Sequence, residues 1–298
     1  MRYRLATATF AVLIAAAAAA QNTDLLVSTG WLQGHLGRRG VIVVEVGDRA
    51  TYEKEHIRGA RFLALSEIAV TRNEIANELP SIAVLETAMR TAGIPDRDHI
   101  VIYSRDILAA ARLFFTLDYL GCGLNISLLD GGYAKWSAES RPVESGAPPQ
   151  QTSTFTACPH PEKVVNLAAM RRIVDLSRIG DSSIAIIDAR PPAAFFGTEA
   201  GQGIVRPGHI PGATNIPWDE NLTSSATPVL RAPEDLKSLY ADAGVRDGTA
   251  VAYCRTGMQA SVTYFALRYL GREVYLYDGS YMEWNCAEGT TVERAPGS

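Results

Sequence analysis

The strongest constraint in this 298-residue sequence is an internal repeat. Residues 101–121 align without a gap with residues 251–271, and nine of these 21 positions are identical. The match extends on both sides, where "LLDGGYAKW" returns as "LYDGSYMEW" and "EHIRGA" returns as "GHIPGA". A chain of this length exceeds the usual size of one domain, so we predict two copies of one fold, each with its own core.

Both copies alternate strand and helix patterns. Short runs rich in Val and Ile, such as "VIVVEV", "HIVIYS" and "TAVAYC", are typical of strands buried in a parallel sheet. Between them lie helical stretches that close on Gly93, Gly121, Gly244 and Gly271, as helix C-termini commonly do. We therefore predict an α/β protein of tandem domains, each a mostly parallel sheet flanked by helices.

The repeat and the composition divide the chain into four parts. We predict a signal peptide over residues 1–20, an N-terminal domain over 21–142, a linker rich in Pro, Ser and Thr over 143–160, and a C-terminal domain over 161–298. The two domains differ mainly in their spacers. The second carries an insertion of about ten residues, roughly "GTEAGQGIVR", near its first loop.

The first twenty residues have the pattern of a secretory leader. Arg2 and Arg4 precede an apolar run that starts at Leu5, acidic residues are absent, and alanines precede Gln21. We expect cleavage after Ala20 and export to the periplasm. The apolar run of about 16 residues is short for a spanning helix, so we expect no stable membrane insertion.

Charge and residue spacing limit the partners of the protein. The chain carries a net charge of −4, and loss of Arg2 and Arg4 with the leader would bring this to about −6. Such a charge disfavours nucleic acid, whereas a small anion can still bind where the local field of a cleft is positive. The five histidines show no metal-binding spacing and there is no Cys-x-x-Cys pair, so we expect no metal and no cofactor.

The segment "YCRTGMQA" predicts a reactive site in the second copy. A strand ends at Cys254 and a helix begins near Gln259 or Ala260, with Gly257 between them to allow a positive φ. In such a turn the backbone amides converge and the helix N-terminus adds partial positive charge, which makes a cradle for an anion. A cysteine at the base of this cradle, beside Arg255, is a candidate nucleophile.

The first copy lacks this combination. It has Ser104 in place of the cysteine, and Asp106 and Ile107 stand where the second copy has Thr256 and Gly257. A carboxylate there would occupy the place of the anion, so we predict that the N-terminal domain is catalytically silent. A free cysteine taken alone is more often a buried core residue. The arginine, the glycine, the helix start and the serine of the silent copy together favour a nucleophile.

Four motifs of the second half carry a family resemblance. "DAR" (188–190), "GHIPGA", "YCRTG" and "DGSYMEW" together resemble two-domain rhodanese-like sulfurtransferases, the family of thiosulfate and 3-mercaptopyruvate sulfurtransferases. The resemblance implies two rhodanese folds and transfer of a sulfane sulfur through a persulfide on Cys254. It also implies a six-residue active loop in the C-terminal domain and a set of substrate-binding residues, namely Arg190, Arg255, Thr256, Gly257, Met258 and Gln259.

Two loop residues bear on the identity of the sulfur donor. Arg255 is similar to the basic residue that follows the cysteine in thiosulfate sulfurtransferases, whereas Thr256 carries a hydroxyl where the mercaptopyruvate enzymes have serine. The fixed positive charges of Arg255 and Arg190 suit the sulfonate end of thiosulfate, a small anionic sulfur donor. We therefore predict a thiosulfate sulfurtransferase, with 3-mercaptopyruvate as the alternative donor. The expected acceptor is cyanide, a small thiol or a dithiol protein.

Two other kinds of function are weaker alternatives. A dual-specificity phosphatase loop needs an arginine six positions after the cysteine, and position 260 is Ala, so the bidentate clamp on a phosphoryl group is missing. A non-enzymatic sulfur-carrier or binding module is the second alternative, and the intact Cys254 argues against it.

Residues that recur in both copies are interpreted as structural. His56 and His209 stand at equivalent turns, and one of the two belongs to the silent copy, which favours a turn role over catalysis. The aromatic residues of the second motif also recur and are predicted to lie in the core: Tyr133, Trp136, Tyr281 and Trp284.

The remaining cysteines are Cys122, Cys158 and Cys286. Export permits a disulfide among them, but their spacing does not choose a pair. We interpret them as free or structural cysteines.

Overall fold

A computed structural model describes residues 25–121, 125–149 and 151–294 of the chain. The predicted signal peptide and Cys122 lie outside the described residues. The first half contains the elements β1 (Leu26–Val27), α1 (Thr29–His35), β2 (Val41–Gly47), α2 (Arg49–Lys54), β3 (His56–Ile57), β4 (Arg61–Ala64), η2 (Leu65–Glu67), β5 (Val70–Arg72), β6 (Ile75–Glu78), α3 (Ile82–Thr91), β7 (His99–Tyr103), α4 (Ile107–Leu120), β8 (Asn125–Leu129), α5 (Gly132–Ala138) and β9 (Val143–Glu144). The second half contains η3 (Pro161–Lys163), β10 (Val164–Val165), α6 (Leu167–Arg178), β11 (Ile184–Asp188), α7 (Pro192–Phe196), β12 (Ala213–Asn215), η4 (Trp218–Asn221), α8 (Pro233–Asp242), β13 (Thr249–Tyr253), α9 (Met258–Tyr269), β14 (Val274–Tyr277) and α10 (Ser280–Cys286).

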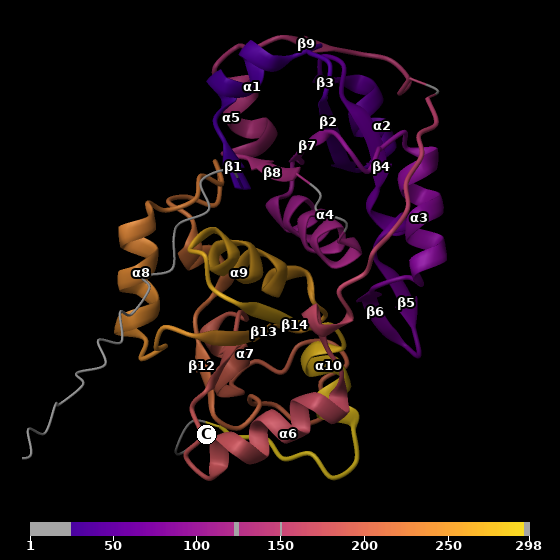
Figure 1. Ribbon diagram of the computed structural model, residues 1–298. Helices are drawn as coiled ribbons and strands as arrows, with labels where there is room; N and C mark the ends of the chain where they lie inside the picture. Colours follow the sequence, from indigo (N-terminus) through magenta and orange to yellow (C-terminus); the bar gives the residue numbers. More distant parts are fainter. Residues whose placement is uncertain (1–24, 122–124, 150, 295–298) are drawn as a thin grey trace, which may run out of the picture.

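Each half forms a five-stranded sheet, and the two sheets have the same topology. The strand order is β1-β8-β7-β2-β4 in the first and β10-β14-β13-β11-β12 in the second, with all neighbours parallel. The Val- and Ile-rich runs of the sequence form the central strands. The predicted fold class, two α/β domains with parallel sheets flanked by helices, is confirmed (Figure 1).

The central strands are mainly apolar because both faces of each sheet are buried. In β7, Ile100 and Ile102 join the core that faces the other domain, whereas Val101 joins a separate core on the outer face. The recurring aromatic side chains fill the outer core of each domain, and their predicted burial is confirmed for Tyr133, Trp136, Tyr281 and Trp284. The four glycines predicted at helix ends, Gly93, Gly121, Gly244 and Gly271, all have positive φ.

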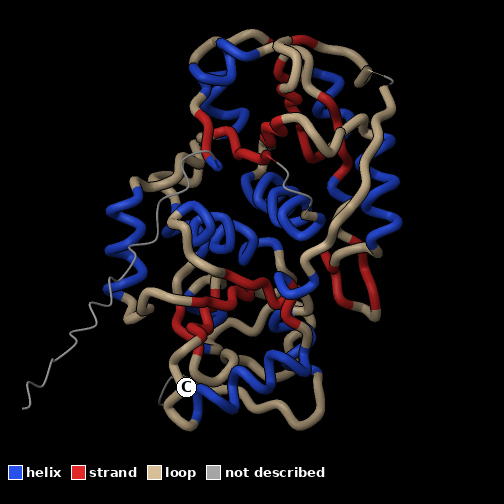
Figure 2. Tube along the Cα trace, viewed as in Figure 1, coloured by secondary structure: helices blue, strands red, loops and turns tan. Residues whose placement is uncertain are grey.

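The two domains meet through their equivalent long helices. Helices α4 and α9 lie side by side between the two sheets (Figures 1 and 2), and most of their residues are buried. Phe114 packs edge-on against Phe265 with ring centroids 4.8 Å apart, and Phe115 packs in the same way against Tyr264 at 4.9 Å. One hydrophobic core therefore continues from the first domain into the second.

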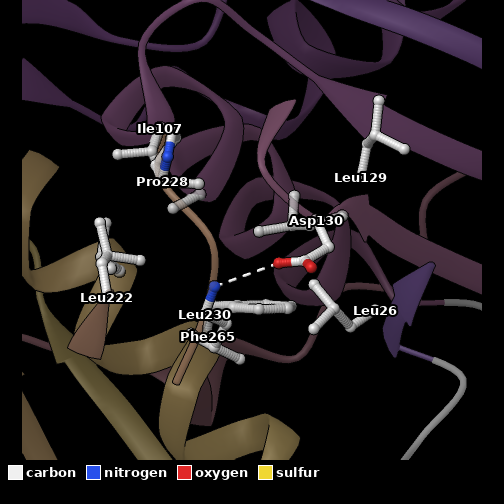
Figure 3. A pocket seen from close by; sticks show the side chains of 11 residues that line it. Leu26, Ile107, Leu129, Asp130, Leu222, Pro228, Leu230 and Phe265 are labelled. Carbon is white, nitrogen blue, oxygen red and sulfur yellow. Dashed lines mark hydrogen bonds between the residues drawn. The ribbon is translucent and has the colours of Figure 1, made fainter. Parts of the chain in front are cut away.

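The domain contact repeats itself with an approximate twofold relation. The amide of Leu230 in the second domain donates a hydrogen bond to Oδ1 of Asp130 in the first, at 3.1 Å (Figure 3). The amide of Leu79 in the first domain donates to Oδ2 of Asp278 in the second, at 2.8 Å. Asp130 and Asp278 are the aspartates of the two "DG" motifs, so the repeat in the sequence reappears at the interface.

The described residues of the predicted linker contact the first domain at several points. The start of the linker forms β9, which pairs with β3, and Phe155 is 1% exposed. Further on, the amide of Ala157 donates to Glu86 on α3 and the amide of Cys158 donates to the carbonyl of Leu120. The composition of this segment indicates only a linker between the domains. The contacts show that it packs on the surface of the first domain. Its exact boundaries stay a prediction.

The cysteines outside the loop differ in state. Cys158 is disulfide-bonded, whereas Cys254 and Cys286 are free thiols. The sequence did not single out Cys158 because spacing carries no information on pairing. None of the helices among the described residues is long and apolar enough to cross a membrane.

Candidate active site

The loop between β13 and α9 has the predicted strand–turn–helix form. Cys254 directly follows β13 and is 1% exposed, and the helix begins at Met258, one residue earlier than expected. Gly257 has φ +87° and precedes the helix. A Cβ at this position would lie 3.1 Å from Nη1 of Arg112, so both the backbone conformation and the close approach require glycine.

Backbone hydrogen bonds hold the thiol of Cys254 at the base of the loop. The amide of Gly257 donates to Sγ of Cys254 at 3.1 Å. On the other side, the amide of Cys254 donates to Oγ of Ser280 at 3.3 Å, and the amides of Tyr281 and Met282 donate to the carbonyls of Cys254 and Arg255. The amide of Gly257 thus places a hydrogen-bond donor at the sulfur, as a site built around a cysteine nucleophile requires.

A cavity of about 390 Å³ opens above the thiol. It is lined by six of the seven predicted site residues, which are Arg190, Cys254, Arg255, Thr256, Met258 and Gln259, while Gly257 lies beneath them in the loop. The insertion of the second domain adds Glu199 and Gly201, and the first domain adds Asn77 and Leu108. The structure thus brings the predicted residues together.

Arg190 is committed to neighbouring groups and is 2% exposed. Its Nε and Nη2 donate to the carboxylate of Asp188, with the shortest contact at 2.6 Å, and Nη2 also donates to the carbonyl of Gly208. Its guanidinium lies 4.0 Å from the ring centre of Tyr281. Burial acts to lower the pKa of Arg190, but the Asp188 carboxylate more than offsets this, so the pKa is raised and the charge is fixed.

Arg255 differs from Arg190 in being exposed to solvent. It lines the cavity above Cys254 and also a second cavity of about 680 Å³ between the β5–β6 hairpin and α10. Its charge is therefore presented to a ligand, whereas that of Arg190 is largely compensated by Asp188. Of the two arginines, Arg255 is the one placed to attract an anion into the site.

The insertion of the second domain is anchored beside the site by Arg206. The guanidinium of Arg206 donates to the carbonyls of Trp284, Asn285, Ala287 and Thr290 around the C-terminus of α10. A cation at this end of a helix satisfies carbonyls that have no partner within the helix. The insertion therefore forms a fixed wall of the cavity.

The equivalent loop of the first domain has no thiol and a different arrangement of charge. Oγ of Ser104 donates to the carbonyl of Val46 at 2.7 Å, and the carboxylate of Asp106 caps α4 by accepting from the amide of Leu108. Arg105 folds back over the ring of Tyr133, with its guanidinium 3.6 Å from the ring centre. A cavity of about 600 Å³ lies at this loop as well, and Ser104, Arg105 and Asp106 line part of it. The two loops therefore differ in the thiol and in the arrangement of charge, and not in the presence of a cavity.

The first-domain residues Asn77 and Leu108 were not among the predicted site residues. Asn77 lies in the β5–β6 hairpin, which belongs to a spacer without a clear match in the repeat. Leu108 lies at the start of the silent copy's own helix. No motif marks either residue, so only the packing of the two domains identifies them.

Tandem parallel-sheet domains with a cysteine at the base of one strand–helix loop define a rhodanese-type protein. The family model described as the Rhodanese-like domain matches the chain twice, over residues 28–139 and 176–287. The chain therefore belongs to the rhodanese-like sulfurtransferase family.

Similar proteins cover nearly the whole chain. It is 31% identical over 280 residues to "Putative thiosulfate sulfurtransferase 1" of Mycobacterium bovis, covering 91% of this chain and 98% of that protein. It is 30% identical over 287 residues to "Sulfur carrier protein TtuD" of Thermus thermophilus, covering 92% of this chain and 98% of that protein. Among solved structures, SseA from Escherichia coli, described with 3-mercaptopyruvate sulfotransferases, matches with a TM-score of 0.74 at 28% identity over 86% of this chain and 98% of that chain.

Proposed function

We propose that the protein is a thiosulfate sulfurtransferase that carries the transferred sulfur as a persulfide on Cys254. The observation behind this is the free thiol at the floor of a cavity, with the amide of Gly257 donating to its sulfur at 3.1 Å. The exposed Arg255 at the same cavity supplies the positive charge that a dianionic donor requires.

The reaction proceeds in two displacements at sulfur. The Cys254 thiolate attacks the outer sulfur of thiosulfate, a new sulfur–sulfur bond forms, and the bond to the sulfonate breaks so that sulfite leaves with the electron pair. The acceptor, cyanide or a thiolate, then attacks the outer sulfur of the persulfide and restores the Cys254 thiolate. The amide of Gly257, which donates to the sulfur, stabilises negative charge on it in the free enzyme and again at the end of the second step.

The identity of the nucleophile is tested by substituting the two equivalent loop residues, Cys254 and Ser104, one at a time. We expect Cys254→Ser to abolish transfer and Ser104→Ala, the matched control, to leave the rate within about a few-fold, since only a thiolate can carry the sulfur. Intact-mass measurement after treatment with thiosulfate should show one added sulfur on the wild type and on Ser104→Ala. Transfer by Cys254→Ser would overturn the proposal.

The donor is tested at Arg255. A charged hydrogen bond contributes about 1.5 to 3 kcal/mol, so Arg255→Gly should lower kcat/KM for thiosulfate by roughly ten- to a hundred-fold. With 3-mercaptopyruvate, which carries a single carboxylate, we expect a smaller loss. If the wild type already prefers 3-mercaptopyruvate, or if Arg255→Gly leaves thiosulfate turnover unchanged, the mercaptopyruvate alternative replaces the thiosulfate proposal.

The sulfur-carrier alternative differs in turnover. The name of the Thermus thermophilus relative supports considering it. An enzyme should form thiocyanate from thiosulfate and cyanide over many cycles, whereas a carrier should load one sulfur and release it only to its partner protein. Steady-state thiocyanate formation by the purified protein decides between them.

We also propose that the protein acts after export, on the basis of the leader pattern in residues 1–20. Cell fractionation with N-terminal sequencing should find a periplasmic chain that begins at Gln21. An uncleaved chain in the cytosol would overturn this proposal.

A further inference from the structure

We propose that Arg112 and Asn77 of the silent N-terminal domain are positioning residues for the Cys254 loop. The inference rests on the proposed role of Cys254 and adds to it a requirement for the first domain. The first domain then supplies two groups that hold the loop of the second in its reactive form.

Arg112 lies directly beneath the loop. It is fully buried on α4, and its Nη1 lies 2.8 Å from Oδ1 of Asp278. These two atoms are close but poorly aligned for a hydrogen bond, so the contact is a pairing of charges more than a directional bond. A Cβ on Gly257 would meet Nη1 of Arg112 at 3.1 Å and Oδ1 of Asp278 at 3.5 Å. The ion pair therefore packs against the residue whose amide donates to the sulfur.

Asn77 connects the same arginine to the loop side chain. Nη2 of Arg112 donates to the carbonyl of Asn77 at 2.6 Å, and Nδ2 of Asn77 donates to Oγ1 of Thr256 at 2.9 Å. Asn77 has φ +66°, a conformation that costs free energy for a residue with a side chain and is held by its surroundings. The strained backbone thus directs its amide side chain at the active loop.

The silent loop receives no such support from the other domain. Val262 stands at the position of the repeat that is equivalent to Arg112. Pro228 lies two residues before Leu230, as Asn77 lies two residues before Leu79, and these leucines make the equivalent interface hydrogen bonds. Val262 and Pro228 both line the small interface cavity that includes Asp130, the counterpart of Asp278 (Figure 3). Each aspartate accepts a hydrogen bond from a leucine amide of the other domain, Asp278 from Leu79 and Asp130 from Leu230. These two hydrogen bonds are therefore a general feature of the domain interface and do not distinguish the active loop from the silent one. Asp130 is paired with Lys135 of its own domain at 3.3 Å, whereas Asp278 is paired with Arg112 of the other domain.

The electrostatic consequence follows from the position of Asp278. Paired with Arg112, its carboxylate adds little net charge beside the loop. If Arg112 is replaced by a neutral residue, the Asp278 carboxylate is left uncompensated close to Gly257 and disfavours the Cys254 thiolate. If Asp278 is replaced by a neutral residue instead, the buried Arg112 guanidinium is left uncompensated and favours the Cys254 thiolate. The other ionisable groups in this environment are Arg72, Glu78, Tyr119, Arg255 and Glu283.

The test compares two variants that break the same ion pair. We measure the pH profile of Cys254 alkylation by iodoacetamide, followed by mass spectrometry of the Cys254 peptide. Arg112→Met should move the midpoint of this profile upward by about one pH unit, and Asp278→Asn should move it downward by a similar amount. Arg112→Lys should restore most of the wild-type profile. Asp130→Asn and Arg268→Met, which change the silent side and a second interdomain ion pair, serve as matched controls and should leave it unchanged.

Opposite shifts separate positioning from a purely structural role, because loss of interface stability alone would act in the same direction in both variants. Circular dichroism checks folding, and if Arg112→Met does not fold, the downward shift in Asp278→Asn carries the test. Equal or absent shifts would overturn the inference while leaving the proposed function intact. Failure of wild-type Cys254 to load sulfur would instead overturn the proposed function.

Asn77 gives an independent measurement. Asn77→Ala removes one hydrogen bond to Thr256, so kcat for thiosulfate should fall about two- to ten-fold with little change in KM. Asn125→Ala, at an exposed asparagine of the first domain outside the cavity, is the matched control. An unchanged kcat in Asn77→Ala would remove Asn77 from the positioning role.

Discussion

The loops of the two domains share a backbone plan. In the silent copy the amide of Tyr133 donates to the carbonyl of Ser104 at 3.1 Å, and in the active copy the amide of Tyr281 donates to the carbonyl of Cys254 at 2.9 Å. Each loop follows a central parallel strand and leads into an interface helix. The two loops therefore share their surroundings and differ within the loop. The active loop places Gly257, with φ +87°, before its helix, whereas the silent helix already begins at the equivalent residue Ile107.

Arginine is used differently in the two loops. Arg105 of the silent loop stacks on Tyr133 and faces the buried carboxylate of Glu45, with Nε 3.6 Å from Oε1. In the active domain the equivalent place, over Tyr281 and beside the sheet carboxylate Asp188, is taken by Arg190. Because Arg190 pairs with the sheet carboxylate Asp188, the loop arginine Arg255 is left available for a ligand. The silent domain has Gly47 at the position of Arg190, so its loop arginine has no such freedom.

The largest expected effect comes from grafting the active loop onto the silent domain. In a Cys254→Ser background, the triple change Ser104→Cys, Asp106→Thr and Ile107→Gly should load no sulfur from thiosulfate, because Arg105 remains bound over Tyr133. Adding Gly47→Arg should allow one sulfur to load. A Cβ at Gly47 would meet Oγ of Ser104 only at 3.8 Å, so there is room for the start of a side chain.

Intact-mass measurement distinguishes zero from one added sulfur in each graft. Loading by the triple variant would show that the loop sequence alone suffices and that the arginine exchange is not the deciding difference. Absence of loading after Gly47→Arg would show that the silent domain also needs support from the other domain, of the kind that Arg112 gives to the active loop.

The next effect is on stability and compares the two arginines beside the sheet carboxylates. Arg190→Ala should lower the free energy of unfolding by about 3 to 5 kcal/mol, because it leaves the fully buried Asp188 without its partner. Arg105→Ala should cost only about 1 kcal/mol, because Arg105 is one-third exposed and its contact with Glu45 is long. Urea denaturation monitored by circular dichroism measures both, and equal losses would contradict the assigned roles.

Glu45 adds a pH dependence to this comparison. Burial raises the pKa of Glu45 above its usual value of 4.5, and Tyr103 and Arg105 act in the opposite direction. Because the folded pKa is the higher one, the associated stability is present below the unfolded pKa and is lost as the pH rises through the folded pKa. Arg105 stabilises only the ionised form of Glu45. The loss of unfolding free energy in Arg105→Ala should therefore be small near pH 4 and grow toward pH 7.

The sequence predicts the fold well because the repeat supplies each element twice. The strands, the helices that end at glycine and the Cys254 loop follow from local patterns that the structure repeats. The role of Arg190 does not follow, because its pairing with Asp188 depends on the direction in which a buried side chain turns. The first domain's contribution is also missed. One signal was present, since Arg112 is a lone charge in the apolar stretch "AARLFF", and a buried arginine requires a partner.

The smallest expected effect concerns the residue that precedes the tyrosine in each copy. Ser280 is buried with φ +52°, whereas the silent copy has Gly132 with φ +53°. The side chain of Ser280 accepts from the amide of Cys254 and donates to the carbonyl of Tyr277 at 2.9 Å. The active copy thus accepts an unfavourable backbone conformation in order to hold the amide behind its nucleophile.

Exchanging these two residues separates backbone strain from hydrogen bonding. Ser280→Gly relieves about 1 kcal/mol of strain and loses hydrogen bonds of similar value, so the free energy of unfolding should change by less than about 1 kcal/mol. The transfer rate should still fall several-fold, because the amide of Cys254 loses its acceptor. The reverse change, Gly132→Ser, should cost about 1 to 3 kcal/mol, since a Cβ there would meet the carbonyl oxygen of Ser104 at 2.8 Å. Denaturation and steady-state kinetics on both variants measure this, and a Ser280→Gly enzyme with unchanged turnover would show that the serine serves the fold and not the thiol.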